Sequence, residues 1–300
     1  MEQIVQCVPN VSEGRNRELV EKIIDVVRET PEVKLLDYSS DADHNRSVIT
    51  FVGTVKGVEQ ASFALCQKAS ELIDMSTHKG EHPRMGATDV IPFIPIKGVT
   101  MEECVDLALR VGEKIGSQLK IPVFMYENAA QVAGRKNLAK VRRGQYEGLE
   151  ERLKQPEHKP DFGPSEFNAG SGATAVGARP PLVAFNVNLN TGNLDIANAI
   201  ARNVRHAGGG LKAVKAMGVT LEDRGIVQVS MNMVNFEETP LYRAVELIRA
   251  EARRYGVSIA GTEIIGLVPQ AALLSTLEYY LGLEGFKPDQ VLENRLQNNE

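Results

Sequence analysis

Residues 182–205, LVAFNVNLNTGNLDIANAIARNVR, decide the fold, because they restart an order of elements with which the chain also begins. Residues 182–189 predict a strand, and residues 194–205 predict a helix. At the start of the chain, residues 3–8 form a short β-rich run, and residues 16–29 carry apolar side chains at helical spacing. Both halves of the chain therefore open with a strand followed by a helix.

The two halves continue with the same types of element. In the first half, the predicted elements are strands 33–38 and 47–53, helix 58–74, strand 89–94, helix 101–118, strand 121–126 and a short helical tail at 146–154. Within strand 89–94, Pro92 indicates an edge strand or a bulge, since proline has no N–H for a central ladder. In the second half, they are strands 211–217 and 226–233, helix 241–255, strand 257–265 and a closing helix at 269–281.

The order β-α-β-β-α-β, found in each half, is that of the ferredoxin-like fold. We therefore expect an α/β (α+β) protein with two lobes, residues 1–180 and 181–300, each a mostly antiparallel sheet with helices on one face. Residues 155–181 are rich in proline and glycine and predict a turn-rich connection, which we assign to the first lobe. We expect a ligand cleft between the two sheets, since a groove between domains is a preferred ligand site.

The composition of the chain argues against some classes of binding partner and some cellular locations. The net charge is -5, from 34 basic and 39 acidic residues, which argues against nucleic acid as the main partner. The three cysteines have no C-x-x-C spacing and indicate a reduced, intracellular protein. No signal-peptide core opens the chain, and no run is long and apolar enough to cross a bilayer. We expect a cytoplasmic protein with small-molecule partners, without nucleic acid or membrane.

The strongest candidate for a site is residues 78–89, HKGEHPRMGATD, which hold two of the five histidines, an arginine and two carboxylates. Gly80, Pro83 and Gly86 disfavour a regular helix or strand there, so we expect an ordered loop. Ionisable groups concentrated in such a loop are typical of a functional site. Residues 43–46, DHNR, predict a turn between two strands that could line the same groove.

A zinc peptidase is one alternative for this loop, because HKGEH matches the H-x-x-E-H pattern. That chemistry needs both histidines on one face of a continuous helix. Gly80 lies inside the pentamer, and Pro83 disfavours a helical conformation at His82. The remaining histidines have no ligand-like spacing, so we expect no metal.

Residues 161–172, DFGPSEFNAGSG, form a second candidate site within the predicted connection. Their glycines permit close backbone approach, and Phe162 and Phe167 could stack on a planar ring. The alternative, to which we give equal weight, is a flexible linker, as glycine- and serine-rich segments often are.

Four motifs together resemble the glutamate formimidoyltransferase family, the formiminotransferase half of formiminotransferase-cyclodeaminase. They are CVPNVSEG at 7–14, IDMS at 73–76 with HKGEHPRMGA at 78–87, DFGPS at 161–165 and GLVP at 266–269. The resemblance covers nearly the whole chain in order. It implies transfer of a formimidoyl group from N-formimidoyl-L-glutamate to N5 of tetrahydrofolate in histidine degradation, with tetrahydrofolate as co-substrate. It also implies two α/β subdomains with folate in the cleft between them, and a homodimer.

The resemblance also implies residue roles. His82 is expected to be catalytic, as a proton shuttle between N5 and the departing glutamate nitrogen. On their chemistry alone, Arg84 could hold a substrate carboxylate and Asp89 could face the cationic formimidoyl group. The segment expected to bind folate, chiefly through its backbone, comprises Gly163, Pro164, Ser165, Glu166, Phe167, Asn168, Ala169, Gly170, Ser171 and Gly172.

Two further alternatives stay open on the sequence. One is a related transfer of a formyl group between glutamate and folate, since a formyl group differs from a formimidoyl group by one oxygen in place of one nitrogen. The other is a folate-binding protein without enzymatic activity. The placement of His82 beside Glu81 and Arg84 argues against the second, because binding alone does not need a proton shuttle.

Overall fold

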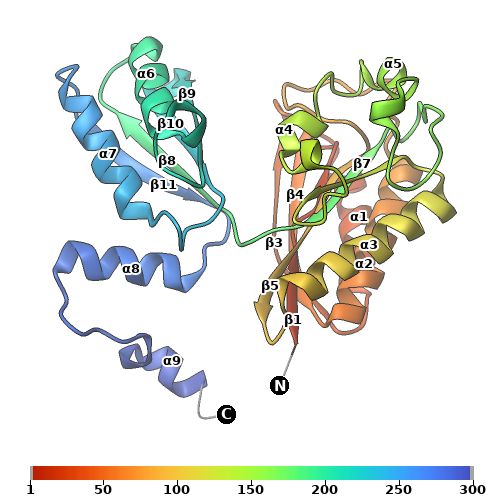
Figure 1. Cartoon of the computed structure of the whole chain (residues 1–300), viewed down its shortest axis with the longest axis horizontal. Coiled ribbons are helices and arrows are strands. Elements are labelled where there is room, and N and C mark those ends of the chain that lie inside the picture. Colours follow the sequence, from red (N-terminus) through yellow and green to blue (C-terminus); the bar gives the residue numbers. More distant parts are fainter. Residues whose placement is uncertain (1–2, 298–300) are drawn as a thin grey trace. The chain divides into compact units, whose positions relative to one another are not determined.

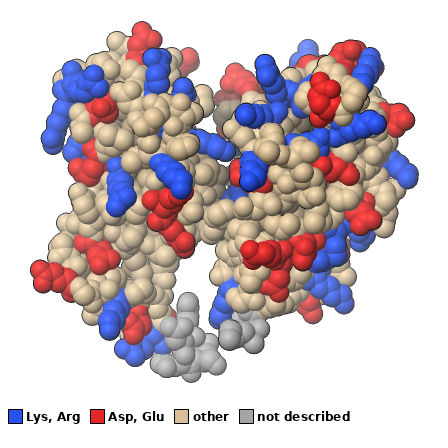
Figure 2. All heavy atoms as spheres, viewed as in Figure 1, with Lys and Arg blue, Asp and Glu red and all other residues tan. Residues whose placement is uncertain are grey.

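A computed structural model describes residues 3–297 of the chain, which divide between Pro180 and Pro181 into two compact units. Each unit combines a β-sheet with packed helices (Figure 1), which confirms the expected mixed α/β class. Figure 2 shows basic and acidic side chains interspersed on the visible surface of each unit. Within the described residues, no helix is both long and apolar enough to cross a membrane.

The first unit contains a seven-stranded sheet in which the opening strand is split into two pieces, β1 and β2. These pieces lie between β4 and β5, which is the split β-α-β arrangement of ferredoxin-like folds. Strand β3 extends the sheet beyond β4, whereas β7 and then β6 extend it beyond β5 in parallel. The bounds are β1 Ile4–Cys7, β2 Asn10–Val11, β3 Val33–Asp41, β4 Arg46–Gly53, β5 Thr88–Lys97, β6 Val123–Glu127 and β7 Thr174–Ala178.

Three helices, α1 (Arg17–Arg28), α2 (Val55–Leu72) and α3 (Met101–Lys114), gather on one side of this sheet (Figure 1). Each begins at a side-chain cap, Asn16, Thr54 or Thr100, whose oxygen accepts an N–H of the first turn. Their apolar faces bury a continuous core against the inner face of the sheet. A π-helical turn, Ile115–Leu119, continues α3 toward β6.

Strand β5 lies in the middle of the sheet, so the expectation that Pro92 marks an edge strand is wrong. The reason lies in its neighbour. The opening strand is interrupted between Cys7 and Asn10, and Pro92 stands opposite that interruption, where its carbonyl accepts from the N–H of Val8 at 3.4 Å. Pro92, which has no N–H to donate, therefore stands where the hydrogen-bond ladder between β5 and the opening strand is already interrupted.

Strand β7 lies inside residues 155–181, which we expected to be a connection without regular structure. Its residues, TAVGA, are buried on both faces between β5 and β6. A Cβ on Gly177 would lie 2.5 Å from the carbonyl oxygen of Tyr126, so only glycine fits there. The short helices α4 (Leu138–Val141) and α5 (Leu149–Leu153) contribute to a separate core with Phe124, Tyr126 and Ala175. This part of the sheet is therefore covered on both faces, not on one.

The second unit has the strand order β11-β8-β10-β9, with every pair antiparallel, which is again the ferredoxin-like order. Helices α6 and α7 share one core with the sheet. Tyr279 of α8 stacks on Tyr242 of α7 with ring centroids 4.2 Å apart. The bounds are β8 Val183–Leu189, α6 Leu194–Val204, β9 Val214–Leu221, β10 Ile226–Met233, α7 Leu241–Arg253, β11 Ile259–Ile265, α8 Gln270–Leu281 and α9 Leu292–Gln297. The expected cleft between the two sheets stays a prediction.

Candidate active site

The loop at residues 78–87 has neither helix nor strand, as its glycines and proline predicted. It packs on the turn between β3 and β4 on one side and on residues 171–173 on the other, and a glycine permits the close approach at each contact. A Cβ on Gly80 would lie 2.3 Å from the carbonyl oxygen of His44. A Cβ on Gly86 would lie 2.4 Å from the carbonyl oxygens of both Ser171 and Ala173. Backbone contact therefore fixes the loop on both sides.

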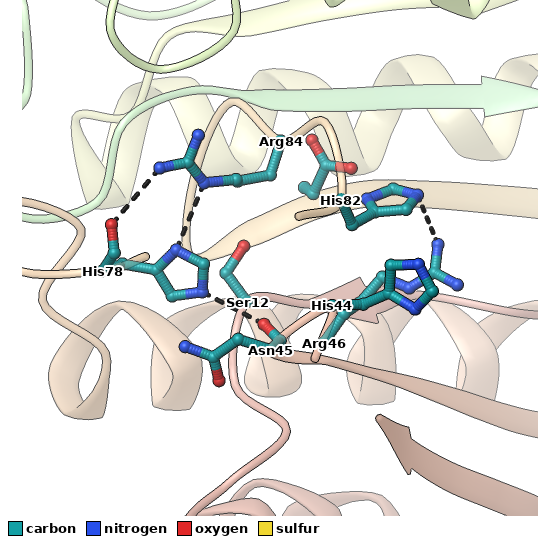
Figure 3. A pocket seen from close by; sticks show the side chains of 8 residues that line it. Ser12, His44, Asn45, Arg46, His78, His82 and Arg84 are labelled. Carbon is teal, nitrogen blue, oxygen red and sulfur yellow. Dashed lines mark hydrogen bonds between the residues drawn. The ribbon is translucent and has the colours of Figure 1, made fainter. Parts of the chain in front are cut away.

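This loop and the β3–β4 turn enclose a small pocket in the first unit (Figure 3). The pocket brings together three of the five histidines and two arginines, from two separate stretches of the sequence, residues 44–46 and 78–84. Within the stretch at residues 43–46, residues 43–45 form a turn, as expected, Arg46 begins β4, and residues 44–46 line the pocket. The lining residues are Ser12, His44, Asn45, Arg46, His78, His82, Arg84 and Asp89.

The imidazole of His82 lies in a cationic environment. Its Nε2 is 2.5 Å from Nη1 of Arg46, whereas its Nδ1 is buried without a partner. Because a guanidinium can only donate, Nε2 is the accepting nitrogen and the proton resides on Nδ1. Burial, followed by the charges of Arg46, Arg142 and His44, lowers the pKa of His82 to about 3. His82 is therefore a neutral imidazole near neutral pH, with its lone pair covered by Arg46.

Arg46 has fewer partners than its charge requires. It donates to His82, its Nε is buried without a partner, and it forms no ion pair with any carboxylate of the described residues. Burial and the nearby charge of Arg142 lower the pKa of its guanidinium. A half-buried cation with a buried, unpartnered Nε–H favours an incoming anion.

Asp89 and Arg142 form a buried ion pair beside His82. Asp89 Oδ1 accepts the backbone N–H of Met85 at 2.9 Å, and Arg142 donates to Oδ2. The Nε of Arg142 is buried without a partner. Both carboxylate oxygens of Asp89 therefore already accept hydrogen bonds from protein groups.

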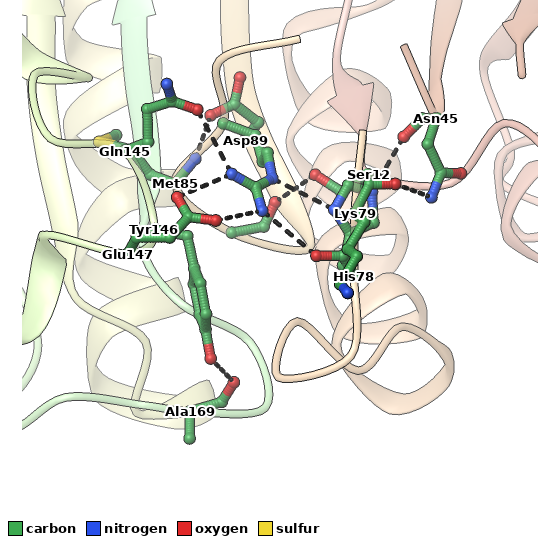
Figure 4. A network of polar contacts seen from close by, with 12 residues as sticks. Ser12, Asn45, His78, Lys79, Met85, Asp89, Gln145, Tyr146, Glu147 and Ala169 are labelled. Carbon is green, nitrogen blue, oxygen red and sulfur yellow. Dashed lines mark hydrogen bonds and ion pairs between the residues drawn. The ribbon is translucent and has the colours of Figure 1, made fainter. Parts of the chain in front are cut away.

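Arg84 also has protein partners throughout, because each of the five N–H groups of its guanidinium has a protein acceptor. Nε donates to Nδ1 of His78 at 3.2 Å, and Nη2 donates to the His78 carbonyl at 3.3 Å. The two terminal nitrogens also bind Glu147, at 2.9 and 2.6 Å, and Nη1 reaches Gln145 at 3.3 Å (Figure 4). This network joins the loop at 78–87 to residues 145–147.

The two histidines of the HKGEH pentamer face different partners. His78 accepts from Arg84 at Nδ1, so its Nε2 carries the proton and donates to the Asn45 carbonyl at 3.0 Å. The helix that a zinc peptidase requires is not formed. Among the described residues, no group of three or more histidine, cysteine, aspartate or glutamate side chains is arranged to hold a metal ion.

The segment at residues 163–172 is ordered against this loop. Carbonyls of its second half accept from Met75 N–H at 2.8 Å, from Ala87 N–H at 2.9 Å and from the Tyr146 hydroxyl at 2.6 Å. Phe167 packs on Tyr146, with ring centroids 5.3 Å apart, and Phe162 packs against the core of the first unit. Both aromatic rings therefore have partners within the protein. These contacts favour a positioned segment over a flexible linker.

Sequence reasoning missed Arg142 and Glu147 and gave Arg46 no role of its own. Arg46 was visible only as one member of a polar turn. Arg142 lies in the basic run from Lys136 to Arg143, which resembles a solvated surface in sequence. No local pattern indicates that these arginines meet His82, because strand pairing and α4 bring them there.

Comparison with known proteins gives one consistent match. Residues 4–179 match the formiminotransferase domain, N-terminal subdomain, and residues 184–293 match the formiminotransferase domain. A glutamate formimidoyltransferase of Streptococcus pyogenes serotype M1 is 54% identical over 99% of both chains. One of Thermoplasma acidophilum is 48% identical over 98% of this chain and 97% of that relative. The formimidoyltransferase-cyclodeaminase of Mus musculus is 45% identical over 95% of this chain but only 53% of its own length.

Proposed function

This chain belongs to the formiminotransferase family, and on that basis we propose that it transfers the formimidoyl group of N-formimidoyl-L-glutamate to N5 of tetrahydrofolate. The products are 5-formimidoyltetrahydrofolate and L-glutamate, and the reaction belongs to histidine degradation. The observation that carries the proposal is the 54% identity with a glutamate formimidoyltransferase over 99% of both chains. The pocket around His82 supplies a chemical reason for the reaction.

We assign His82 as the catalytic residue. Attack of N5 on the amidine carbon forms a tetrahedral intermediate, in which N5 must lose a proton and the departing glutamate nitrogen must gain one. A neutral imidazole can accept the first proton and return it as the second. Burial and then the charges of Arg46, Arg142 and His44 oppose the imidazolium form. A bound substrate carboxylate would offset the contribution of these charges and so make proton transfer to His82 more favourable.

We propose that tetrahydrofolate binds along residues 163–172. Glycines at both ends adopt positive φ, +83° at Gly163 and +67° at Gly172, which shapes the segment into a fixed loop. Its second half is held through carbonyl groups, as described above. Within the described part of the chain, the backbone N–H groups of residues 165–169 donate to no other protein group. These N–H groups are suited to acceptor atoms of a folate.

Arg84 and Asp89 remain proposed substrate contacts, each with a condition set by the geometry. Arg84 could take a substrate carboxylate only by exchanging it for Glu147. Asp89 could face the formimidoyl group only by releasing Arg142. As they stand, both side chains hold the loop that carries His82.

We further propose that residues 1–180 and 181–300 act as the two formiminotransferase subdomains of a cytoplasmic homodimer. The boundary follows the two compact units and the two family matches. Light scattering over a range of protein concentrations tests the dimer, for which a monomer mass throughout is the contrary result.

The test of the function is an absorbance assay for 5,10-methenyltetrahydrofolate, which forms when 5-formimidoyltetrahydrofolate is acidified. Purified protein is mixed with tetrahydrofolate and N-formimidoyl-L-glutamate, and N-formyl-L-glutamate replaces the donor in a parallel reaction. Turnover of the first donor supports the proposal. Turnover of the formyl donor alone, or folate binding without turnover of either donor, contradicts it.

A further inference from the structure

Arg46 and Arg84, the two arginines that line the pocket, differ in the number of their N–H groups that lack a protein acceptor. Arg84 uses all five N–H groups on protein acceptors. Arg46 has one acceptor, the Nε2 of His82, together with a buried Nε–H that has no partner. Of these two guanidinium groups, therefore, Arg46 is the one available to a substrate carboxylate without breaking an existing ion pair.

The charges around Arg46 also favour an anion. Asp41 is paired with His44 at 2.8 Å and Asp89 is paired with Arg142, so these two nearby carboxylates act on the charge of Arg46 only from a distance, without an ion pair to it. Three residues in or beside this pocket, Arg46, His82 and Arg142, each have a buried side-chain nitrogen without a partner among the described residues. Such a concentration of unsatisfied donors in one place is typical of a ligand site.

The chemistry of the donor decides which carboxylate fits. In N-formimidoyl-L-glutamate, the α-carboxylate is attached to the same carbon as the reacting nitrogen, whereas the side-chain carboxylate is several bonds away. His82 must reach the reacting nitrogen, and Arg46 lies 2.5 Å from His82. An arginine in contact with the proton-transferring imidazole is therefore within reach of the α-carboxylate.

Resting on the proposed function, we infer that Arg46 binds the α-carboxylate of the donor and in doing so leaves Nε2 of His82, which becomes free to accept the proton from N5. Without donor, the guanidinium covers this lone pair. With donor, the carboxylate offers a stronger, charge-assisted acceptor than a neutral imidazole. Arg46 thus couples recognition of the α-carboxylate to activation of His82, and the protein selects donors that carry an α-carboxylate.

The experiment compares three donors: N-formimidoyl-L-glutamate, its α-carboxamide and its γ-carboxamide. For the wild-type protein, kcat/KM for the α-carboxamide should be about 10- to 150-fold lower than for the natural donor, the range expected for a charge-assisted hydrogen bond. In Arg46→Met, kcat/KM for the natural donor should fall by a similar factor, and the preference over the α-carboxamide should shrink to less than about 3-fold. Any preference over the γ-carboxamide should be the same in both proteins.

Arg17→Met serves as the matched control, because Arg17 is exposed at the start of α1 and lies outside the pocket. Arg46→Lys, which keeps the charge, should retain part of the α-carboxylate preference and replaces the methionine variant if that one does not fold. Equal use of the natural donor and the α-carboxamide by the wild type overturns the inference. An undiminished preference in the Arg46 variants also overturns it. Absence of wild-type turnover with the natural donor contradicts the proposed function instead.

Discussion

Replacing Arg142 by methionine should destabilise the first unit by about 3–5 kcal/mol, because the Asp89 carboxylate then stays buried without its cation. The Asp89 side chain is 1% exposed and that of Arg142 is 15% exposed, so water cannot substitute for the guanidinium without local opening. The N–H of Met85 still donates to Asp89 at 2.9 Å, which places the expected loss nearer the lower end of this range. Methionine fills most of the arginine's apolar volume, so lost packing contributes little.

The double variant Asp89→Asn/Arg142→Met separates the charge from the packing, because it leaves no buried charge and should be more stable than the single Arg142 variant. The measurement is hydrogen exchange in urea, followed at amides of β5 and β7, since a chain of two units need not unfold in one step. A loss below about 1 kcal/mol in Arg142→Met, or a double variant less stable than the single one, would refute this reasoning. The same Asp89→Asn substitution tests the proposed donor contact, which an unchanged KM for formiminoglutamate contradicts.

Three further predictions concern the same loop. Gly86→Ala should lower both stability and turnover, because its Cβ would lie 2.4 Å from two carbonyl oxygens; thermal unfolding and the absorbance assay check this, and a variant with wild-type values contradicts it. Folding lowers the pKa of His82 from 6.5 to about 3. Between these pH values the unfolded state binds more protons than the folded state, so the free energy of unfolding should fall as the pH decreases from about 6.5 toward 3. Urea midpoints of wild type and His82→Gln over this pH window should diverge, and parallel curves would exclude the effect. Arg84→Lys should reduce turnover by loosening the loop, since lysine cannot donate to all five acceptors. An unchanged KM for formiminoglutamate with reduced kcat assigns Arg84 to loop positioning, whereas a raised KM alone supports direct carboxylate binding.

Sequence reasoning recovered the elements whose periodicity reflects burial on one face. Strand β10 was predicted at residues 226–233, the bounds found in the structure, because its side chains alternate between the core and the opposite face. Strand β7 was missed because TAVGA is buried on both faces and consists largely of small residues, which carry no alternating signal. Of the two alternatives for Pro92, an edge strand or a bulge, the edge strand was wrong, because the break in the neighbouring strand that accommodates the proline comes from a distant part of the chain.

The site was predictable to the extent that its residues are neighbours in sequence. His82 and Arg84 fall in one loop, whose glycines and proline predict an irregular backbone, and Asp89 follows two residues after it in β5. The partners of these residues do not share that stretch. The pairing of β3 with β4 places Arg46 beside His82, and the end of α4 places Arg142 there. The number of N–H groups of each arginine that lack an acceptor is therefore known only from the folded chain.

The measurement that tests the central claim most directly is the formation of 5,10-methenyltetrahydrofolate after acidification, compared between the wild type and His82→Gln, with His206→Gln as the control. His206 is exposed, belongs to the second unit and is not among the residues that line the His82 pocket. We predict that His82→Gln loses at least about 100-fold in turnover, the lower range for removal of a general acid–base group. Its affinity for tetrahydrofolate, measured by calorimetry, should remain within a few-fold of wild type. Near-normal turnover by His82→Gln would contradict the assignment of His82 as the proton-transferring residue.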